Sequence, residues 1–250
     1  HTTGTLSSGD ATGATAQMWA FVRRDSPQTS YNRMTELLPP SERLSGKVAL
    51  VIGGSRGLGA AITHALASQG CSVFLNYHRS KAEAERTLAS FGGAPDRITL
   101  LQGNAADLEW CETARRTILN RSGRLDLLIC NASPPIRPLA LVPEKLALFE
   151  QFVTHSLALV TSPMATCLST LSEQEGWNIV LSSAFVTDLP ADFPHYVTAK
   201  CAVEGLVRWA AVHHPKVRHL IVGHRNYSLI KRIRPWGAKE PWQSSKPPRP

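Results

Sequence analysis

The sequence predicts an α/β domain in which a doubly wound parallel sheet lies between two layers of helices, a three-layer αβα arrangement. From Lys47 onward, short apolar runs alternate with segments of helical periodicity. The apolar runs are continuous instead of alternating in polarity, as expected for strands that are buried on both faces. A glycine-rich turn joins the first run to the first helical segment. This alternation of strand and helix is typical of parallel sheets.

Six apolar runs predict the strands. They cover residues 47–52, 72–77, 97–103, 125–130, 178–183 and 217–222. After the first strand, a helical stripe that ends at Gly70 is formed by four apolar residues, Leu58, Ile62, Ala65 and Leu66. Further helices are expected at residues 80–91, 107–121, 143–174 and 195–213. Pro163 is expected to break or bend the longest of these helices.

The predicted domain covers residues 45–222, with a segment of different composition at each end. Residues 1–44 begin with a stretch rich in Gly, Ser, Thr and Ala, and they are expected to be a flexible leader. Residues 223–250 contain seven Lys or Arg, one acid and five prolines. This basic tail is interpreted either as a segment that binds nucleic acid or membrane, or as a truncated or out-of-frame ending. We prefer the second interpretation, because no apolar run follows that could form a final strand.

Composition argues against several classes of protein. No run approaches 18 apolar residues, so no membrane-spanning helix is expected, and no secretory signal is visible. The five cysteines are scattered and none is spaced C-x-x-C, which argues against a disulfide framework or a metal site and indicates a reducing cytoplasm. The net charge of +8 comes mostly from the tail, so the folded domain is not expected to bind nucleic acid.

The turn after the first strand reads IGGSRGLG. Glycines allow a sharp turn and a close approach of a ligand to the backbone, and the helix that begins there offers free N–H groups to a pyrophosphate. A merely convenient tight turn is the alternative, but the position between strand and helix favours a dinucleotide site. The residues expected to contact the cofactor are Gly53, Ser55, Arg56, Gly57, Leu58 and Gly59.

The charges near this turn predict which dinucleotide binds. NAD sites usually place an acid about 20 residues after the glycines, at the end of the second strand. No Asp or Glu lies between Gly59 and Glu83, whereas Arg56 lies in the turn and Arg79 follows the second strand. Guanidinium groups there would pair with a 2′-phosphate, although each could instead be a solvated surface charge. The sequence therefore predicts NADP(H).

Tyr196 and Lys200 are four residues apart in a predicted helix. Side chains at this spacing lie on the same helical face, so both head groups would point to one place. A surface pair, in which the lysine stem lies along the ring, is the alternative for these two residues alone.

Four segments together resemble the short-chain dehydrogenase/reductase family: IGGSRGLG, CNAS (130–133), LSSAF (181–185) and YVTAK (196–200). The resemblance covers about residues 44–222 and looks closest to 3-oxoacyl-carrier-protein reductases and polyketide ketoreductase domains. Ser183 lies thirteen residues before Tyr196, which is the spacing usual in that family. The resemblance implies a Rossmann-like fold and favours a homo-oligomer.

The resemblance also implies roles for single residues. Tyr196 would be the general acid that protonates a substrate carbonyl. Lys200, together with the positive charge of the oxidised nicotinamide, would lower the pKa of the phenol, and it would also hold the nicotinamide ribose. Ser183 would donate a hydrogen bond to the developing oxyanion, although a strand-end hydroxyl that bonds its own turn is the alternative. Asn131 would steady the sheet beside the cofactor, and Asn104 stands where many relatives carry an acid near the adenine.

One departure from the family concerns the long helix before the fifth strand. Relatives usually carry an asparagine there that holds a water in a proton relay, but this chain has His155 or Ser156 at that place. A histidine could relay protons, although a histidine inside a helix is more often simply packed.

These observations predict a cytoplasmic, NADPH-dependent reductase of a small-molecule or acyl-carrier-bound carbonyl compound, such as a 3-oxoacyl group. Two alternatives are a family member that binds cofactor or partner without turnover, and a basic interaction module. The first alternative follows from the atypical tail, which would leave the nicotinamide half of the site poorly closed.

Overall fold

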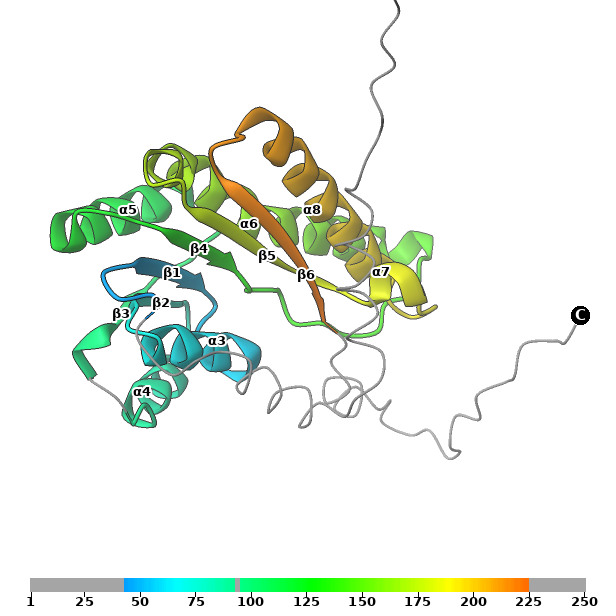
Figure 1. Ribbon diagram of the computed structural model, residues 1–250. Helices are drawn as coiled ribbons and strands as arrows, with labels where there is room; N and C mark the ends of the chain where they lie inside the picture. Colours follow the sequence, from blue (N-terminus) through cyan, green and yellow to red (C-terminus); the bar gives the residue numbers. More distant parts are fainter. Residues whose placement is uncertain (1–42, 93–94, 225–250) are drawn as a thin grey trace, which may run out of the picture. The chain divides into compact units, whose positions relative to one another are not determined.

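The computed structural model describes residues 43–92 and 95–224 and confirms the predicted fold class (Figure 1). Six strands pair in parallel in the order β3-β2-β1-β4-β5-β6. The strands are β1 (Val48–Ile52), β2 (Ser72–Tyr77), β3 (Ile98–Gln102), β4 (Leu127–Cys130), β5 (Trp177–Ser183) and β6 (Arg218–His224). The chain first builds the sheet outward from β1 to β3. It then returns to the other side of β1, where β4, β5 and β6 follow in order.

Helices cover the two faces of this sheet (Figure 1). On one face lie α3 (Gly57–Ser68) and α4 (Lys81–Ala89). On the other face lie α5 (Leu108–Ser122), α6 (Leu146–Glu173) and α8 (Pro194–His213). The shorter elements are η1 (Pro95–Arg97), η2 (Pro143–Lys145) and the single turn α7 (Phe185–Asp188), which precedes α8.

The core has two halves, one on each side of the sheet. All five residues of β1 are buried, and successive side chains point to opposite faces. Leu50 packs in the half beneath α5, α6 and α8, whereas Val51 packs in the half beneath α3 and α4. Burial on both faces explains why the strand sequences are continuously apolar.

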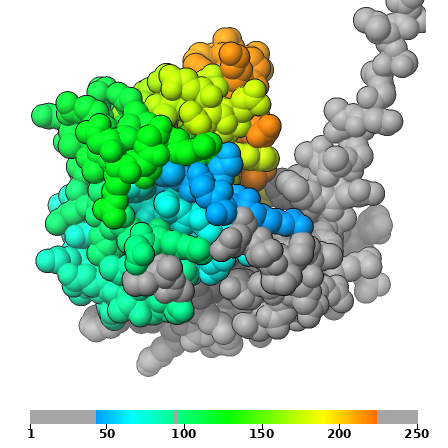
Figure 2. All heavy atoms as spheres, turned by 60° about the vertical axis from the view of Figure 1, so that its left-hand side comes forward, coloured from blue at the N-terminus to red at the C-terminus, as the bar shows by residue number. Residues whose placement is uncertain are grey.

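The first described residues are tied to the centre of the domain. The N–H of Val48 and the ammonium of Lys47 both donate to the carboxylate of Asp126, each at 3.0 Å, and Arg124 donates to it as well. Burial alone would raise the pKa of Asp126, but the hydrogen bonds from Arg124 and Lys47 outweigh that effect and lower it. Figure 2 shows the start of the described chain in blue at the surface of the domain, next to segments coloured green.

Most predicted element boundaries agree with the structure to within two residues. Of the two outcomes expected for α6, a break at Pro163 is absent, because the helix runs through this residue without interruption, and a bend there stays a prediction. A proline removes only one backbone donor, and α6 packs against both α5 and α8, which supports a continuous helix.

The predicted leader and basic tail fall almost wholly on residues 1–42 and 225–250, which lie outside the described residues. Their proposed roles therefore stay predictions. Within residues 43–92 and 95–224, no helix has both the length and the apolar character needed to cross a membrane.

Candidate active site

The predicted site residues lie at the carboxyl ends of the strands. The glycine turn follows β1, Asn131 follows β4, and Ser183 is the last residue of β5. Because the strands are parallel, these ends share one edge of the sheet, where ligands bind in open α/β sheets. Tyr196 and Lys200 come to the same edge from the first two turns of α8.

The glycine turn is pinned between two neighbouring strands. The N–H of Gly53 donates to Oδ1 of Asn76 at 3.3 Å, and its carbonyl accepts from Nδ2 of Asn131 at 2.8 Å. Gly53 has φ +75°, a backbone conformation that favours glycine. A Cβ on Gly59 would overlap the carbonyl oxygen of Gly53, so the start of α3 can lie this close to the turn only without a side chain.

The N-terminus of α3 is open to an anion. Arg56 occupies the N-cap position, but no described side chain caps the helix, and its first turn contains no acid. The free N–H groups and the helix dipole there favour a negatively charged group. Ser55 is buried, Leu58 is half-buried, and Arg56 and Gly57 are exposed around this helix start. The turn therefore fits the pyrophosphate of a dinucleotide.

The other predicted cofactor residues surround this turn less closely. Arg79 is exposed just after β2, and its contact with the cofactor stays a prediction. Asn104 follows β3, and its Oδ1 accepts the N–H of Ala106 at 3.1 Å, which forms a local turn before α5. The structure thus gives Asn104 a role in the backbone, and its contact with the adenine stays a prediction.

Asn76 is a site residue that the sequence analysis missed. Its side chain is 3% exposed, and Nδ2 donates to the carbonyl of Gly103 at 3.0 Å while Oδ1 holds Gly53. One amide therefore joins the turns that follow β1 and β3. The available signal was a polar residue inside the otherwise apolar run SVFLNY, because a buried amide must be hydrogen-bonded.

Ser183, Tyr196 and Lys200 come together, as the sequence predicted. The Nζ of Lys200 lies 5.7 Å from the centroid of the Tyr196 ring and donates to the carbonyl of Leu181 at 2.6 Å. The Oγ of Ser183 accepts the N–H of Phe185 at 3.2 Å and also takes part in a hydrogen bond with Tyr196. The alternative interpretation of Ser183, a hydroxyl that bonds its own turn, is therefore observed, and its role as an oxyanion donor stays a prediction.

Burial dominates the electrostatics of this group. It raises the pKa of Tyr196, and the hydrogen bond with Ser183 opposes part of that rise. Burial also lowers the pKa of Lys200 to about 8, while the nearby Cys130 and Glu204 act in the opposite direction. Burial therefore leaves the pKa of Tyr196 above its ordinary value. The lowering expected from Lys200 together with an oxidised nicotinamide stays a prediction.

Aromatic rings surround the phenol. The ring centroids of Phe185 and Tyr196 are 5.8 Å apart at 90°, and those of Phe152 and Tyr196 are 6.3 Å apart at 69°. The ring centroids of Phe193 and Phe185 are 5.5 Å apart, and those of His195 and Phe152 are 4.4 Å apart. These rings come from α6, α7 and the start of α8, so only the tertiary fold brings them together.

The position where relatives carry an asparagine lies on α6 in this chain. His155 is exposed there, and the Oγ of Ser156 is buried with no hydrogen-bond partner among the described residues. Neither side chain is joined to Tyr196 or Lys200 by a described hydrogen bond, so a proton relay through them stays a prediction. In the described part of the chain, no cluster of His, Cys, Asp or Glu could hold a metal ion.

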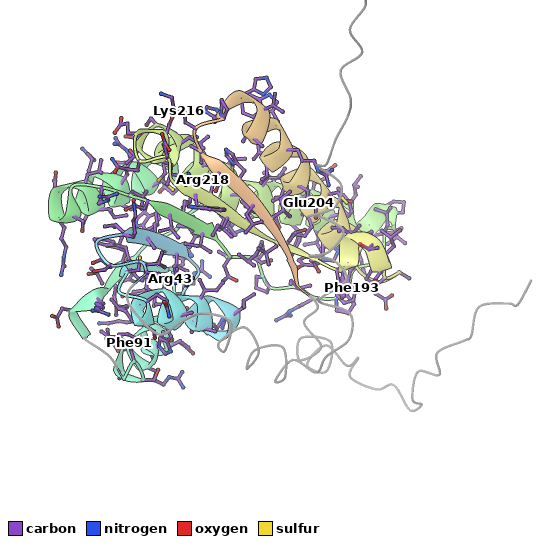
Figure 3. All side chains as sticks on the ribbon, viewed as in Figure 1. Arg43, Phe91, Phe193, Glu204, Lys216 and Arg218 are labelled. Atoms are coloured by element: carbon purple, nitrogen blue, oxygen red, sulfur yellow. The ribbon has the colours of Figure 1, made fainter. Side chains whose placement is uncertain are left out.

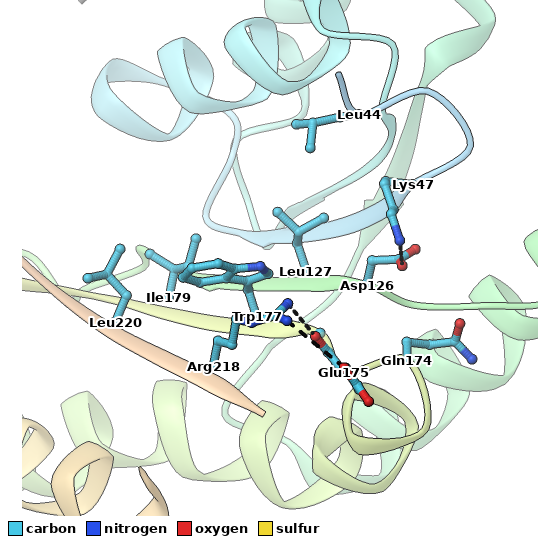
Figure 4. Close-up of a pocket in the computed structure, with 11 residues that line it drawn as sticks. Leu44, Lys47, Asp126, Leu127, Gln174, Glu175, Trp177, Ile179, Arg218 and Leu220 are labelled. Atoms are coloured by element: carbon cyan, nitrogen blue, oxygen red, sulfur yellow. Dashed lines mark hydrogen bonds and ion pairs between the residues drawn. The ribbon is translucent and has the colours of Figure 1, made fainter. Parts of the chain in front are cut away.

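A cavity of about 610 Å³ lies at the opposite edge of the sheet (Figure 4). Leu127, Trp177 and Arg218, which begin β4, β5 and β6, line it. Contacts of Lys47 with Asp126 and of Arg218 with Glu175 lie along its wall. None of the predicted site residues lines this cavity, which is separate from the carboxyl edge.

Comparison with known proteins supports the fold and the family resemblance. The family model of short chain dehydrogenases matches residues 47–221. A solved structure of an alcohol dehydrogenase from the archaeon Thermococcus sibiricus, complexed with 5-hydroxy-NADP, superposes with a TM-score of 0.63. It is 26% identical, and the match covers 71% of this chain and 75% of that one.

Two curated reductases are also similar. A hydroxynaphthalene reductase of Aspergillus fumigatus is 28% identical over 170 residues, which is 67% of this chain and 61% of that protein. A 3-oxoacyl-[acyl-carrier-protein] reductase of Synechocystis is 35% identical over 89 residues, 36% of each chain. The chain thus spans less than two thirds of the length of these relatives. Because the family model matches nearly all of the folded region, the chain belongs to the short chain dehydrogenase family, whose members bind a nicotinamide cofactor.

Proposed function

We propose that this chain is an NADPH-dependent reductase that converts a carbonyl group, of the 3-oxoacyl type or a similar ketone, to an alcohol. The observation that carries the proposal is the meeting of Ser183, Tyr196 and Lys200 beside the glycine turn, at one edge of the sheet. A site for carbonyl reduction needs a proton donor, an oxyanion donor and a cofactor cradle close together. Tyr196, Ser183 and the glycine turn can supply these in that order.

Each side chain has a definite task in this scheme. The substrate oxygen would accept hydrogen bonds from the hydroxyls of Ser183 and Tyr196, and the phenol would give it the proton as the C–O double bond becomes single. A bound NADPH would supply the hydride. The raised pKa of Tyr196 keeps the proton on the phenol at neutral pH, as an acid requires. The ammonium of Lys200 would hold the ribose and offset negative charge on the phenol oxygen.

The choice of NADP(H) is supported by charge and by one relative. Arg56 and Arg79 are both exposed near the turn, and guanidinium groups suit a 2′-phosphate. The similar Thermococcus enzyme is described in complex with an NADP derivative. The similar hydroxynaphthalene and 3-oxoacyl reductases support reduction as the direction of reaction.

The test is the rate of NADPH oxidation at 340 nm with a simple ketone, compared between the wild type and two variants. Tyr196→Phe and Ser183→Ala should each lower kcat by about a hundredfold or more, because they remove the proton donor and an oxyanion donor. Ser90→Ala is the matched control: this hydroxyl bonds the carbonyl of Thr87 at the end of α4, away from the site. NADPH should be used in preference to NADH.

Equal rates for the wild type and Tyr196→Phe would contradict the proposal. In that case, quenching of protein fluorescence by NADPH would identify the alternative, a family member that binds cofactor without turnover.

A further inference from the structure

We infer that the rings of Phe185 and Phe193 make this site selective for an uncharged, planar aromatic ketone, an inference that rests on the proposed carbonyl reductase function. Phe185 lies two residues after Ser183, and Phe193 lies three residues before Tyr196. The chain segments that deliver the two reacting hydroxyls therefore each deliver a ring as well.

The two rings lie next to the reacting phenol and next to each other. Phe185 meets the Tyr196 ring edge to face, with centroids 5.8 Å apart, and lies 5.5 Å from Phe193. The N–H of Phe185 donates to the Oγ of Ser183, which ties the position of this residue to the predicted oxyanion donor. A carbonyl oxygen held between Ser183 and Tyr196 would therefore bring the rest of its molecule close to these rings.

Both rings keep part of their surface accessible. Phe185 and Phe193 are half-buried, unlike the core residue Phe74, which is 2% exposed. Figure 3 shows Phe193 at the start of α8, close to α7. Accessible aromatic surface beside a reacting group can contact a ligand instead of only filling the core.

The imidazole that packs beside the rings is uncharged. His195 is 2% exposed, and its ring centroid lies 4.4 Å from that of Phe152 and 6.3 Å from that of Phe193. Burial lowers the pKa of His195, so this imidazole is neutral at physiological pH. The segment from Ser183 to Tyr196 contains two acids, Asp188 and Asp192, and no Lys or Arg. It therefore offers no cation to the phosphate of a carrier-bound or coenzyme-bound substrate.

These observations distinguish two kinds of ketone. A planar ring next to the carbonyl can stack or make edge-to-face contacts with Phe185 and Phe193, and such pairs are favoured beyond the area that they bury. A flexible acyl chain must lose rotational freedom to fill the same space, and its phosphate-bearing carrier would gain no charge partner from this segment. The rings thus favour the aromatic ketone.

The test uses two ketones with the same bicyclic carbon skeleton, 2-tetralone and 2-decalone, which differ in one aromatic ring. The wild type with NADPH should show a kcat/KM about tenfold higher for 2-tetralone, because only this ketone can make ring contacts. Phe185→Leu and Phe193→Leu should each reduce this preference, measured as the ratio of kcat/KM for the two ketones, by roughly threefold to tenfold. Phe185→Tyr, which keeps a ring, should retain the preference.

Phe91→Leu is the matched control. Phe91 is also half-buried and pairs with a histidine, His64, at 5.6 Å, but it lies beyond the end of α4, away from Phe193 (Figure 3). This variant should keep the wild-type preference.

Two results would overturn the inference while leaving the reductase in place: equal use of 2-tetralone and 2-decalone by the wild type, or an unchanged preference in the Phe185→Leu/Phe193→Leu double variant. The wild-type comparison needs no variant, so it decides the matter even if a substitution prevents folding. Reduction of neither ketone nor any other carbonyl, with either NADPH or NADH, would instead be a failure of the proposed function.

Discussion

The ammonium of Lys200 lies in a place that does not favour charge. The residue is 8% exposed, and its Nζ donates to the carbonyl of Leu181. Its carboxylate neighbour on α8, Glu204, accepts a hydrogen bond from Ser182 at 2.6 Å and pairs with Arg208. Glu204 is thus already engaged by other partners, and burial remains the main influence on Lys200, whose pKa is lowered to about 8.

This shift predicts the pH dependence of the reductase. As pH rises through about 8, Lys200 loses its proton, so kcat/KM should fall above that pH. Tyr196 cannot cause this fall, because its pKa is raised above the ordinary value and the phenol stays protonated. A profile of kcat/KM from pH 6 to 10 measures the effect.

Lys200→Arg provides the comparison, since a guanidinium stays charged throughout this range. Its residual activity should lack the fall near pH 8. A fall at the same pH in both proteins would assign the titration to another group.

At the scale of elements, the cofactor turn depends on amides from the strands beside β1. Asn76 and Asn131 come from the ends of β2 and β4 and hold the N–H and the carbonyl of Gly53. The backbone N–H of Gly54 also donates to the carbonyl of Asn76 at 2.9 Å. The turn is therefore shaped before any ligand binds, which reduces the entropy cost of binding.

Replacing Asn76 with leucine tests this arrangement. Asn76→Leu keeps the volume of the side chain but leaves the N–H of Gly53 and the carbonyl of Gly103 without their partner. Leaving a polar group unpaired away from water costs about 1–3 kcal/mol, so for these two groups the free energy of unfolding should fall by roughly 2–6 kcal/mol.

Urea unfolding measures this loss, and NADPH titration should show weaker binding in the same variant. Asn120→Ala, on the exposed face of α5, should change stability by no more than about 0.5 kcal/mol. An Asn76→Leu protein as stable as the wild type would mean that the amide does not hold the turn.

At the scale of the whole described domain, four of the five cysteines are buried thiols, and three of these lie in the two halves of the core. Cys71 lies in the half beneath α3 and α4, and Cys130 and Cys167 lie in the other half. Burial raises the pKa of Cys71, Cys111 and Cys167 to about 12 and raises that of Cys130 as well. Only Cys201, on α8, is exposed.

These thiols predict that stability decreases in alkaline solution. In the unfolded chain they ionise near pH 9, whereas in the folded protein they keep their protons, so above pH 9 the folded state binds more protons than the unfolded state. The free energy of unfolding should therefore fall by up to about 1.4 kcal/mol per pH unit for each buried thiol. Between its lowered and its ordinary pKa, Lys200 makes the free energy of unfolding rise with pH. This single group opposes four thiols, so the decrease should dominate.

Urea unfolding at pH 8 and pH 10 measures the decrease. Cys201→Ser should leave it unchanged, while Cys167→Ala should make it smaller by one thiol's share. Equal stability at the two pH values would show that the thiols ionise in the folded state.

Much of this protein follows from the sequence by itself. Continuous apolar runs such as KVALVI predicted the strands, because a strand buried on both faces has no polar side to show. The glycine turn and the i, i+4 spacing of Tyr196 and Lys200 are local patterns, so they predicted the cofactor cradle and one pair of the candidate site. The family resemblance predicted from these motifs is confirmed by the family model.

The tertiary structure decided what depends on contacts between distant segments. The helix α6 packs against α5 and α8 and continues through Pro163, so of the expected break or bend the break is absent. The amide of Asn76 acquires its role only when β2 lies beside β1, and the raised pKa of Tyr196 follows from burial that no local pattern reports. Local spacing determines which side chains share an element. Which elements meet, and how far they exclude water, is settled only when the whole chain packs.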